Sequence, residues 1–218
     1  MLPSIPRLEF HPEIHRYRYK YEWLLNNVTG VLSFDMDPAK RAAIEHYKSG
    51  EKGWAARGTA LHKVMEQLLK GIDFEHADIW DDWVGDLVNC DLFQTSEALA
   101  VEYPLCDEKK DLGGSFDFLL KDEEGKLVLG DLKSCSSKSA AKRREPATAQ
   151  LGAYLDMLLA HHPTLEIDKC VTVVSGPGIC KTIEDDPDEC LNEWYEKWGL
   201  FEADRDLREN WDHEELPF

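Results

Sequence analysis

Two carboxylates interrupt segments that otherwise have the apolar character of core strands. Asp117 lies between two phenylalanines in 115–121, and Asp131 lies between a glycine and a leucine in 126–134. Acidic residues and a glycine at 122–125 separate these segments, as in the turn of a β-hairpin. The sequence therefore predicts a hairpin that brings the two acids within about one residue pair of exact register.

Two neighbouring carboxylates repel each other, and burial raises the cost of their charges further. A divalent cation such as Mg²⁺ would relieve both penalties. Lys133 follows Asp131 by two residues, so both side chains leave a strand on the same face. A lysine there could orient a metal-bound water and stabilise charge on phosphorus. The alternative is an ordinary Asp–Lys pair on a solvated sheet face, because short motifs often match by chance.

Helices and strands are predicted to alternate along the chain. A strand or hairpin near 15–20 is followed by a short helix after Thr29, and a C-terminal strand and acidic helix follow Gly178. Apolar residues at helical spacing predict a helix over 57–71. Together these patterns favour a mixed α/β fold. The other predicted elements are helices at 39–47, 81–88 and 147–162 and strands at 99–105, 115–121, 126–134 and 170–174.

The length of 218 residues, with 43% apolar residues and seven tryptophans, is enough for one domain with a substantial core. We expect a single domain over 1–218. Its core is expected at about 57–175, with an N-terminal extension over 1–56 and a C-terminal strand and helix over 176–218. No segment approaches the roughly 18 consecutive apolar residues of a membrane span, and the N-terminus lacks a signal-peptide core. An intracellular, cytoplasmic location without membrane partners is therefore expected.

The formal net charge of −18 argues against a general nucleic-acid binder, because phosphate contacts need lysine and arginine. The segment 133–144, however, carries five basic residues and no acid. Such an island fits a protein that binds nucleic acid at one place, and it fits equally well a basic surface loop. The six cysteines contain no C-x-x-C pair, which favours mostly buried, reduced thiols.

Two helices carry further candidate residues at i, i+4 spacing. His62 and Glu66 flank the apolar stripe of 57–71, and Gly58 would let the start of this helix pack closely against another backbone. Gln150 and Tyr154 form a similar pair on the helix 147–162. Taken alone, a histidine of this kind is more often a hydrogen-bonded structural residue, and the tyrosine a residue at the edge of the core.

Taken in order, these pieces resemble the RecB-like branch of the PD-(D/E)XK nucleases. The resemblance covers residues 57–154 and four short motifs. It implies a restriction-endonuclease-like core of helix, three strands, helix and strand, with N-terminal and C-terminal helical additions. The motifs are Gly58-x-x-x-His62-x-x-x-Glu66, Gly114-x-x-Asp117, Asp131-x-Lys133 and Gln150-x-x-x-Tyr154.

The resemblance also implies roles for single residues. One or two Mg²⁺ or Mn²⁺ ions would be bound, and Lys133 would be the catalytic lysine. Glu66 would support catalysis, as Glu102 on the preceding strand could. Gln150 and Tyr154 would hold the nucleic acid or brace the site. The implied metal ligands are His62, Asp117, Asp131 and the carbonyl of Leu132.

Basic residues near these motifs are candidates for phosphate contacts, chosen by charge and position rather than by resemblance. For each of them a merely solvated side chain is an equally good interpretation. The candidates are Arg57, Lys138, Lys142, Arg143 and Arg144.

Several relatives carry an iron–sulfur cluster, with one cysteine ahead of the histidine motif and three near the C-terminus. Here no cysteine precedes Cys90 and the C-terminal ones are widely spaced, so no cluster is expected. We expect a metal-dependent exonuclease that acts on DNA ends, as in phage or organellar replication, recombination or repair. A recombination or replication protein is the kind of protein partner that such a role would involve. The alternatives are an endonuclease on the same core and a catalytically silent subunit that binds DNA ends.

Overall fold

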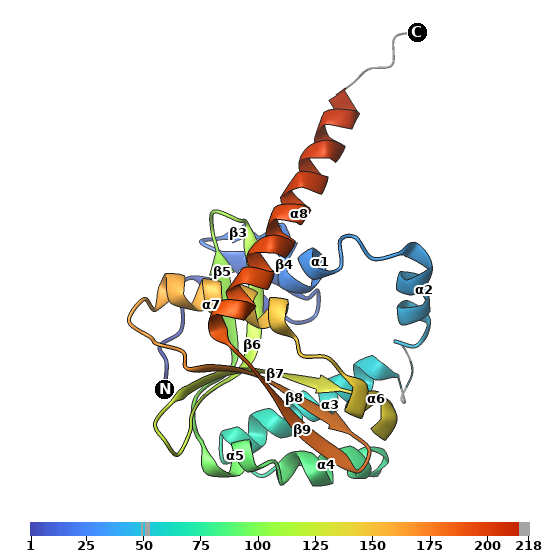
Figure 1. Ribbon diagram of the computed structural model, residues 1–218, viewed down its shortest axis with the longest axis vertical. Helices are drawn as coiled ribbons and strands as arrows, with labels where there is room; N and C mark the ends of the chain where they lie inside the picture. The colour runs from blue at the N-terminus through green and yellow to red at the C-terminus, as the bar shows by residue number, and fades with distance from the viewer. Residues whose placement is uncertain (49, 51–52, 214–218) are drawn as a thin grey trace.

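The computed structural model describes residues 1–48, 50 and 53–213, and the prediction of a mixed α/β fold is confirmed (Figure 1). The strands are β1 (Leu8–His11), β2 (Arg16–Tyr19), β3 (Glu22–Trp23), β4 (Asn26–Asn27), β5 (Glu97–Asp107), β6 (Leu112–Lys121), β7 (Leu127–Ser134), β8 (Lys169–Gly176) and β9 (Ile179–Asp185). The helices are α1 (Val28–Leu32), α2 (Pro38–His46), α3 (Trp54–Leu69), η1 (Asp78–Trp80, 3-10), α4 (Asp81–Val88), α5 (Asp91–Thr95), α6 (Lys138–Arg143), α7 (Thr148–His161) and α8 (Pro187–His213).

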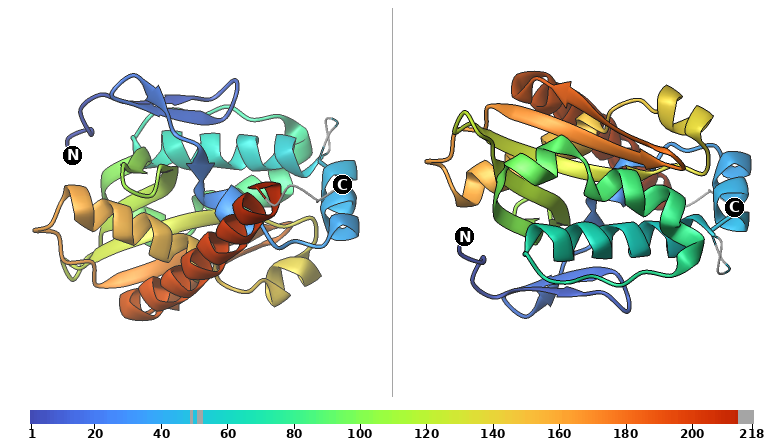
Figure 2. Two further views of the ribbon diagram at one scale, coloured as in Figure 1. Left: turned by 90° about the horizontal axis from the view of Figure 1, so that it is seen from above. Right: turned by 90° about the horizontal axis from the view of Figure 1, so that it is seen from below.

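A six-stranded sheet forms the centre of the molecule. Its path runs β4-β6-β7-β8-β9, and β5 pairs with β6. Strands β5, β6 and β7 are antiparallel neighbours, β7 and β8 are parallel, and β9 returns antiparallel to β8. A parallel pair needs a crossover connection, which α7 supplies between β7 and β8. In Figures 1 and 2, α7 and α8 lie on one side of the sheet and α3, α4 and α5 on the other.

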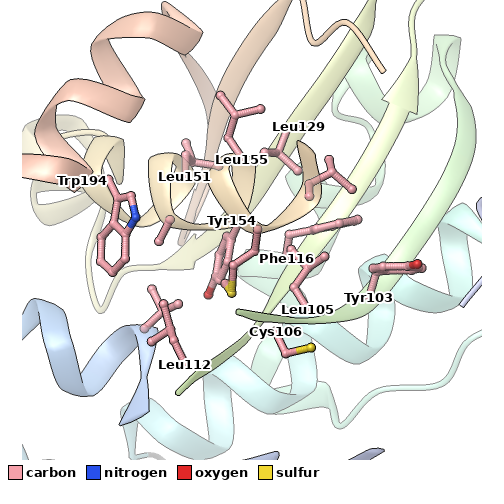
Figure 3. Packing of buried hydrophobic residues seen from close by; sticks show 14 of the residues in the cluster. Tyr103, Leu105, Cys106, Leu112, Phe116, Leu129, Leu151, Tyr154, Leu155 and Trp194 are labelled. Atoms are coloured by element: carbon pink, nitrogen blue, oxygen red, sulfur yellow. The ribbon is translucent and has the colours of Figure 1, made fainter. Parts of the chain in front are cut away.

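Each face of the sheet has its own apolar core. The core beneath α7 contains Leu151, Leu155 and Trp194, and Figure 3 shows these side chains gathered over the sheet. The other core joins α3 and α4 to the opposite face of the sheet. Leu61, Val64 and Met65 of α3 are fully buried there, as the helical spacing of apolar residues predicts.

The element boundaries agree with the sequence pattern where that pattern is long. The predicted helix 81–88 coincides with α4, and the predicted hairpin near 15–20 is formed by β1 and β2. The short helices α5 and α6 were not predicted, because five or six residues are too few to display a helical period. The middle of the basic segment 133–144 is therefore helical rather than a loop.

The N-terminal extension packs against the central sheet through Tyr17. This side chain is buried, its hydroxyl lies 3.0 Å from Oγ of Ser115, and a Cβ at Gly113 would come within 2.5 Å of its ring. Gly113 is therefore needed for the close approach of β2 to β6.

Five of the six cysteines are buried, in agreement with the expectation of mostly buried thiols. In the part of the chain that the structure describes, no helix has both the length and the apolar character required to cross a membrane.

Candidate metal centre

The candidate site lies where β6 and β7 separate. Their ladder ends at the pair Phe118 and Gly130, directly before Asp117 and Asp131, so the hairpin places the two acids at the end of the paired region as predicted. Further along the same strand, β4 pairs with Leu112 and Gly113 of β6. The motif Gly114–Asp117 thus spans the stretch between these two pairings. The Asp117 carboxylate uses this opening to accept a hydrogen bond from the backbone N–H of Leu132.

His62 of α3 reaches this opening from the side and lies among three acceptor groups. Its Nδ1 is 3.2 Å from Oε1 of Glu102 and 3.3 Å from Oδ1 of Asp117, and its Nε2 is 3.1 Å from the carbonyl oxygen of Leu132. The potential ligand atoms of His62, Glu102 and Asp117 all lie within 4.8 Å of one another. The structure therefore brings together three of the four implied metal ligands, and it adds Glu102 to them.

Glu102 occupies an unusual place in β5. Its backbone has φ of 49°, a left-handed conformation that is costly for a residue other than glycine, by about 1–3 kcal/mol. The residues on either side, Val101 and Tyr103, pair regularly with β6, so the distortion is confined to Glu102. Such local strain persists only when surrounding contacts hold it, and here it accompanies the contact with His62. No sequence pattern marks this conformation.

Protonation of His62 offsets one of the two carboxylate charges of this cluster, and burial raises the pKa of Glu102. Burial alone would lower the pKa of His62, but the carboxylates of Asp117 and Glu102 outweigh it and raise that pKa well above 6.5. Both ring nitrogens face acceptors, so the imidazolium form satisfies the geometry best. The proton supplies the positive charge that two carboxylates and a carbonyl attract, and a divalent cation could supply it instead.

A second group of side chains surrounds Asp131 on the α7 side. The Nζ of Lys133 lies 2.7 Å from Oδ2 of Asp131 and donates a hydrogen bond of 2.8 Å to Oε1 of Gln150. Gln150 donates from Nε2 to Oδ1 of Asp131 at 2.9 Å and to the hydroxyl of Tyr154 at 2.8 Å. The i, i+4 pair on α7 is therefore joined to the D-x-K motif through Gln150.

Burial raises the pKa of Asp131 to about 6, although Lys133 opposes the rise. The Oδ2 atom of Asp131 is buried and is held by the 2.7 Å ion pair with Lys133. Tyr154 is 4% exposed, and burial raises its pKa well above 10. Of the two roles expected for Tyr154, bracing the site agrees with its burial and with the hydrogen bond that it accepts from Gln150.

Two features of α3 differ from the expectation. Glu66 forms ion pairs with Lys63 at 2.7 Å and Lys70 at 2.6 Å on its own helix, and its charge contributes to the raised pKa of Glu102. It makes no hydrogen bond to His62 or to either aspartate, and Glu102 occupies the position next to His62 instead. A Cβ at Gly58 would meet only Oγ of Ser134, at 3.9 Å, so the expected close backbone contact is absent between the described residues.

The candidate phosphate contacts lie in different surroundings. Lys138, Lys142, Arg143 and Arg144 are exposed, as a solvated side chain or a phosphate contact requires. Lys138 donates to the carbonyl of Gly178 and Arg143 to Oγ of Ser139, at 2.7 and 2.5 Å. Arg57 is only 6% exposed, so the alternative that it is merely solvated is wrong.

The donor set fits a hard divalent cation. Mg²⁺ and Mn²⁺ prefer oxygen ligands and accept imidazole, and the cluster offers two carboxylates beside Nδ1 of His62, with the carbonyl of Leu132 beside Nε2 of the same ring. The buried carboxylate of Asp131, paired with Lys133, supplies further oxygen atoms in the neighbouring group. The arrangement therefore combines a candidate cation site with a lysine and a hydrogen-bonded glutamine, a combination suited to activating water near a phosphate.

Comparison with known proteins does not assign this site. No protein-family model matches the chain, and no curated protein matches it. A solved structure described as the crystal structure of SSO0001 aligns with 80% of this chain and 75% of that chain, with 16% identity and a TM-score of 0.40. A similarity this weak supports no inference about activity. The function is therefore inferred from the geometry of the site.

Proposed function

We propose that this chain is a metal-dependent deoxyribonuclease with a PD-(D/E)XK core, acting as an exonuclease on DNA ends. The observation that carries the proposal is the cluster of His62, Glu102 and Asp117 within 4.8 Å, beside the ion pair of Asp131 and Lys133. A solvated Asp–Lys pair on a sheet face would not explain why Asp131 is buried, at 2% exposed, in its ion pair with Lys133.

In this proposal His62, Glu102 and Asp117 hold Mg²⁺ or Mn²⁺, with the Leu132 carbonyl and Asp131 as further oxygen ligands. When bound, the cation would polarise the phosphate and lower the pKa of a bound water. Lys133 supplies a positive charge and a proton donor at Nζ, directed by its hydrogen bond to Gln150. Gln150 is held in turn by Asp131 and Tyr154, so the position of the lysine is determined by α7 as well as by β7.

The test is digestion of single-stranded and double-stranded DNA labelled at the 5′ or the 3′ end, with Mg²⁺ or Mn²⁺ and with EDTA. We expect metal-dependent release of labelled fragments, and at least ~100-fold slower cleavage by Lys133→Ala, because a positioned acid–base group contributes about that much. Lys126→Ala is the matched control, since Lys126 lies in the β6–β7 turn and pairs with Glu124 there.

Covalently closed circles distinguish the mode of cleavage, because an exonuclease leaves them intact whereas an endonuclease linearises them. Pure protein that never cuts DNA in either metal would refute the proposal. Cutting by Lys133→Ala at the rate of Lys126→Ala would refute it as well. Tight DNA binding that is indifferent to metal and to Asp117→Asn would instead favour a silent end-binding subunit.

A further inference from the structure

Three basic side chains from separate elements surround the end of β7. Arg57 comes from the first turn of α3, Arg144 follows α6, and Lys181 lies on β9. The chain contains 43 acidic and 25 basic residues, so a group of three basic side chains runs against its overall composition, although Glu145 follows Arg144 in the sequence. The end of β7 follows Lys133 directly, and one residue along a strand is only about 3.3 Å. The cluster is therefore next to the candidate metal centre.

Arg57 is the buried member of the cluster. Its side chain donates from Nε to Oγ of Ser134 at 3.3 Å, and its guanidinium lies 5.8 Å from the ring centroid of Trp83. Among the residues that the structure describes, no carboxylate pairs with it. Burial lowers its pKa, which reflects the cost of holding this charge away from water. A buried guanidinium with donors to spare is well suited to bind an anion.

Lys181 and Arg144 lie near the same end of β7, around Cys135. The Nζ of Lys181 donates to the backbone carbonyls of Lys142 and Arg144 at 3.1 and 3.2 Å, which ties β9 to the segment after α6. All three positive charges affect the pKa of Cys135, the residue after Ser134. Burial raises the pKa of its thiol, and Arg144, Arg57 and Lys181 each oppose the rise. Within the described part of the chain, no carboxylate shifts this pKa.

The indole of Trp83 contacts both Arg57 and the backbone of Cys135. Its Nε1 donates to the carbonyl of Cys135 at 2.7 Å, while Arg57 lies near its ring. Trp83 belongs to α4, so α3, α4 and β7 together determine where the guanidinium lies. Two of the other predicted phosphate contacts, Lys138 and Arg143, donate to the carbonyl of Gly178 and to Oγ of Ser139.

We propose that Arg57, Arg144 and Lys181 form a phosphate-binding subsite that holds a second phosphate group of the nucleic-acid strand. The nucleic acid comes from the proposed function, on which this inference rests. The phosphate belongs either to the terminus of a strand or to an internal phosphodiester. Guanidinium groups suit both, because each presents several N–H donors in a fixed plane to phosphate oxygens.

Oligonucleotide binding tests the subsite directly. Kd is measured without cleavage, in the Lys133→Ala background, for Arg144→Gln, Lys181→Gln and the control Lys126→Gln. We expect each cluster variant to bind about 5-fold to 10-fold more weakly and to lower the salt dependence by about one phosphate contact, whereas the control stays within about twofold. Kd values and salt slopes equal to those of the control would overturn the proposal.

The end groups of the oligonucleotide identify the phosphate. Four oligonucleotides of one sequence carry a hydroxyl or a phosphate at each end. A loss of affinity confined to one phosphorylated end supports a terminal phosphate in the subsite, and a loss on all four supports an internal phosphodiester.

A second measurement separates this inference from the nuclease proposal. Inorganic phosphate is titrated into the unmodified protein without metal or DNA, and Tm is compared with that in sodium chloride of equal ionic strength. We expect a higher Tm in phosphate, reduced in Arg144→Gln and abolished in Arg57→Gln if that variant folds. If this result holds and DNA is never cut, the nuclease proposal is wrong and the subsite stands. If DNA is cut but neither Tm nor Kd responds to the variants, the subsite is wrong.

Discussion

The two halves of the candidate site differ in the positive group that lies beside their buried carboxylates. On the α7 side, Asp131 is matched by Lys133 and by a hydrogen bond from Gln150. On the α3 side, Asp117 and Glu102 share a single histidine, which offsets one of their two negative charges and does so only while it is protonated. The α7 half therefore has its own permanent cation, whereas the α3 half depends on a positive charge from solution. This difference makes the α3 half the better candidate for binding a metal and the α7 half the better candidate for proton transfer.

The largest effect is expected when the α3 half loses its buried carboxylate. Asp117→Asn keeps the shape of the side chain and removes one of two negative charges beside His62. We expect Mn²⁺ binding, measured by calorimetry on protein freed of metal, to weaken at least ~100-fold, or about 3 kcal/mol. Cleavage should fall with it. An unchanged Mn²⁺ affinity would mean that the cation binds elsewhere.

Glu102→Gln removes the other carboxylate of the α3 half and should have a smaller effect, because Glu102 is more exposed than Asp117. We expect roughly tenfold weaker Mn²⁺ binding, a typical cost for groups that support a metal site. The same calorimetric titration measures it. A loss as large as that of Asp117→Asn would show that the two carboxylates contribute equally.

Tyr154, which braces the α7 half, should affect mainly stability. Tyr154→Phe deletes the hydroxyl that accepts from Gln150, and the loss of one hydrogen bond should lower the free energy of unfolding by about 1 kcal/mol. Denaturant unfolding measures this change. Mn²⁺ affinity should stay within about twofold, and a large loss would indicate that the two halves are coupled more tightly than their separate contacts suggest.

The smallest effect is expected at Glu66, where resemblance and geometry disagree. Its ion pairs with Lys63 and Lys70 are near the surface, and such pairs contribute little. Glu66→Gln should therefore change the cleavage rate and the Mn²⁺ affinity by less than about threefold. A tenfold loss of cleavage rate or of Mn²⁺ affinity would contradict this expectation. It would imply that the Glu66 side chain turns toward the cation and contributes to the site.

Much of the scaffold could be predicted because its signals are local. The apolar spacing of α3 and α7, the alternating strands β6 and β7 and the turn between them each lie within about 15 residues, where helical and strand periods are readable. The turn residues also determine the register that brings Asp117 and Asp131 to the end of the ladder. Helices α5 and α6 were not predicted because five or six residues are too few to show the helical spacing of apolar side chains.

The sequence by itself determined the order of the elements and the pairing of the D-x-K strand with Asp117, because residue spacing and turn chemistry act over short distances. The tertiary structure alone decided which carboxylate faces His62. Glu102 lies 40 residues away in sequence and reaches the histidine through a distorted backbone, while the nearby Glu66 pairs with lysines of its own helix. Burial of Arg57 against Trp83 and Ser134 is likewise a result of packing between distant segments. Side-chain direction, local strain and burial depend on all the neighbours at once, and no short sequence pattern encodes them.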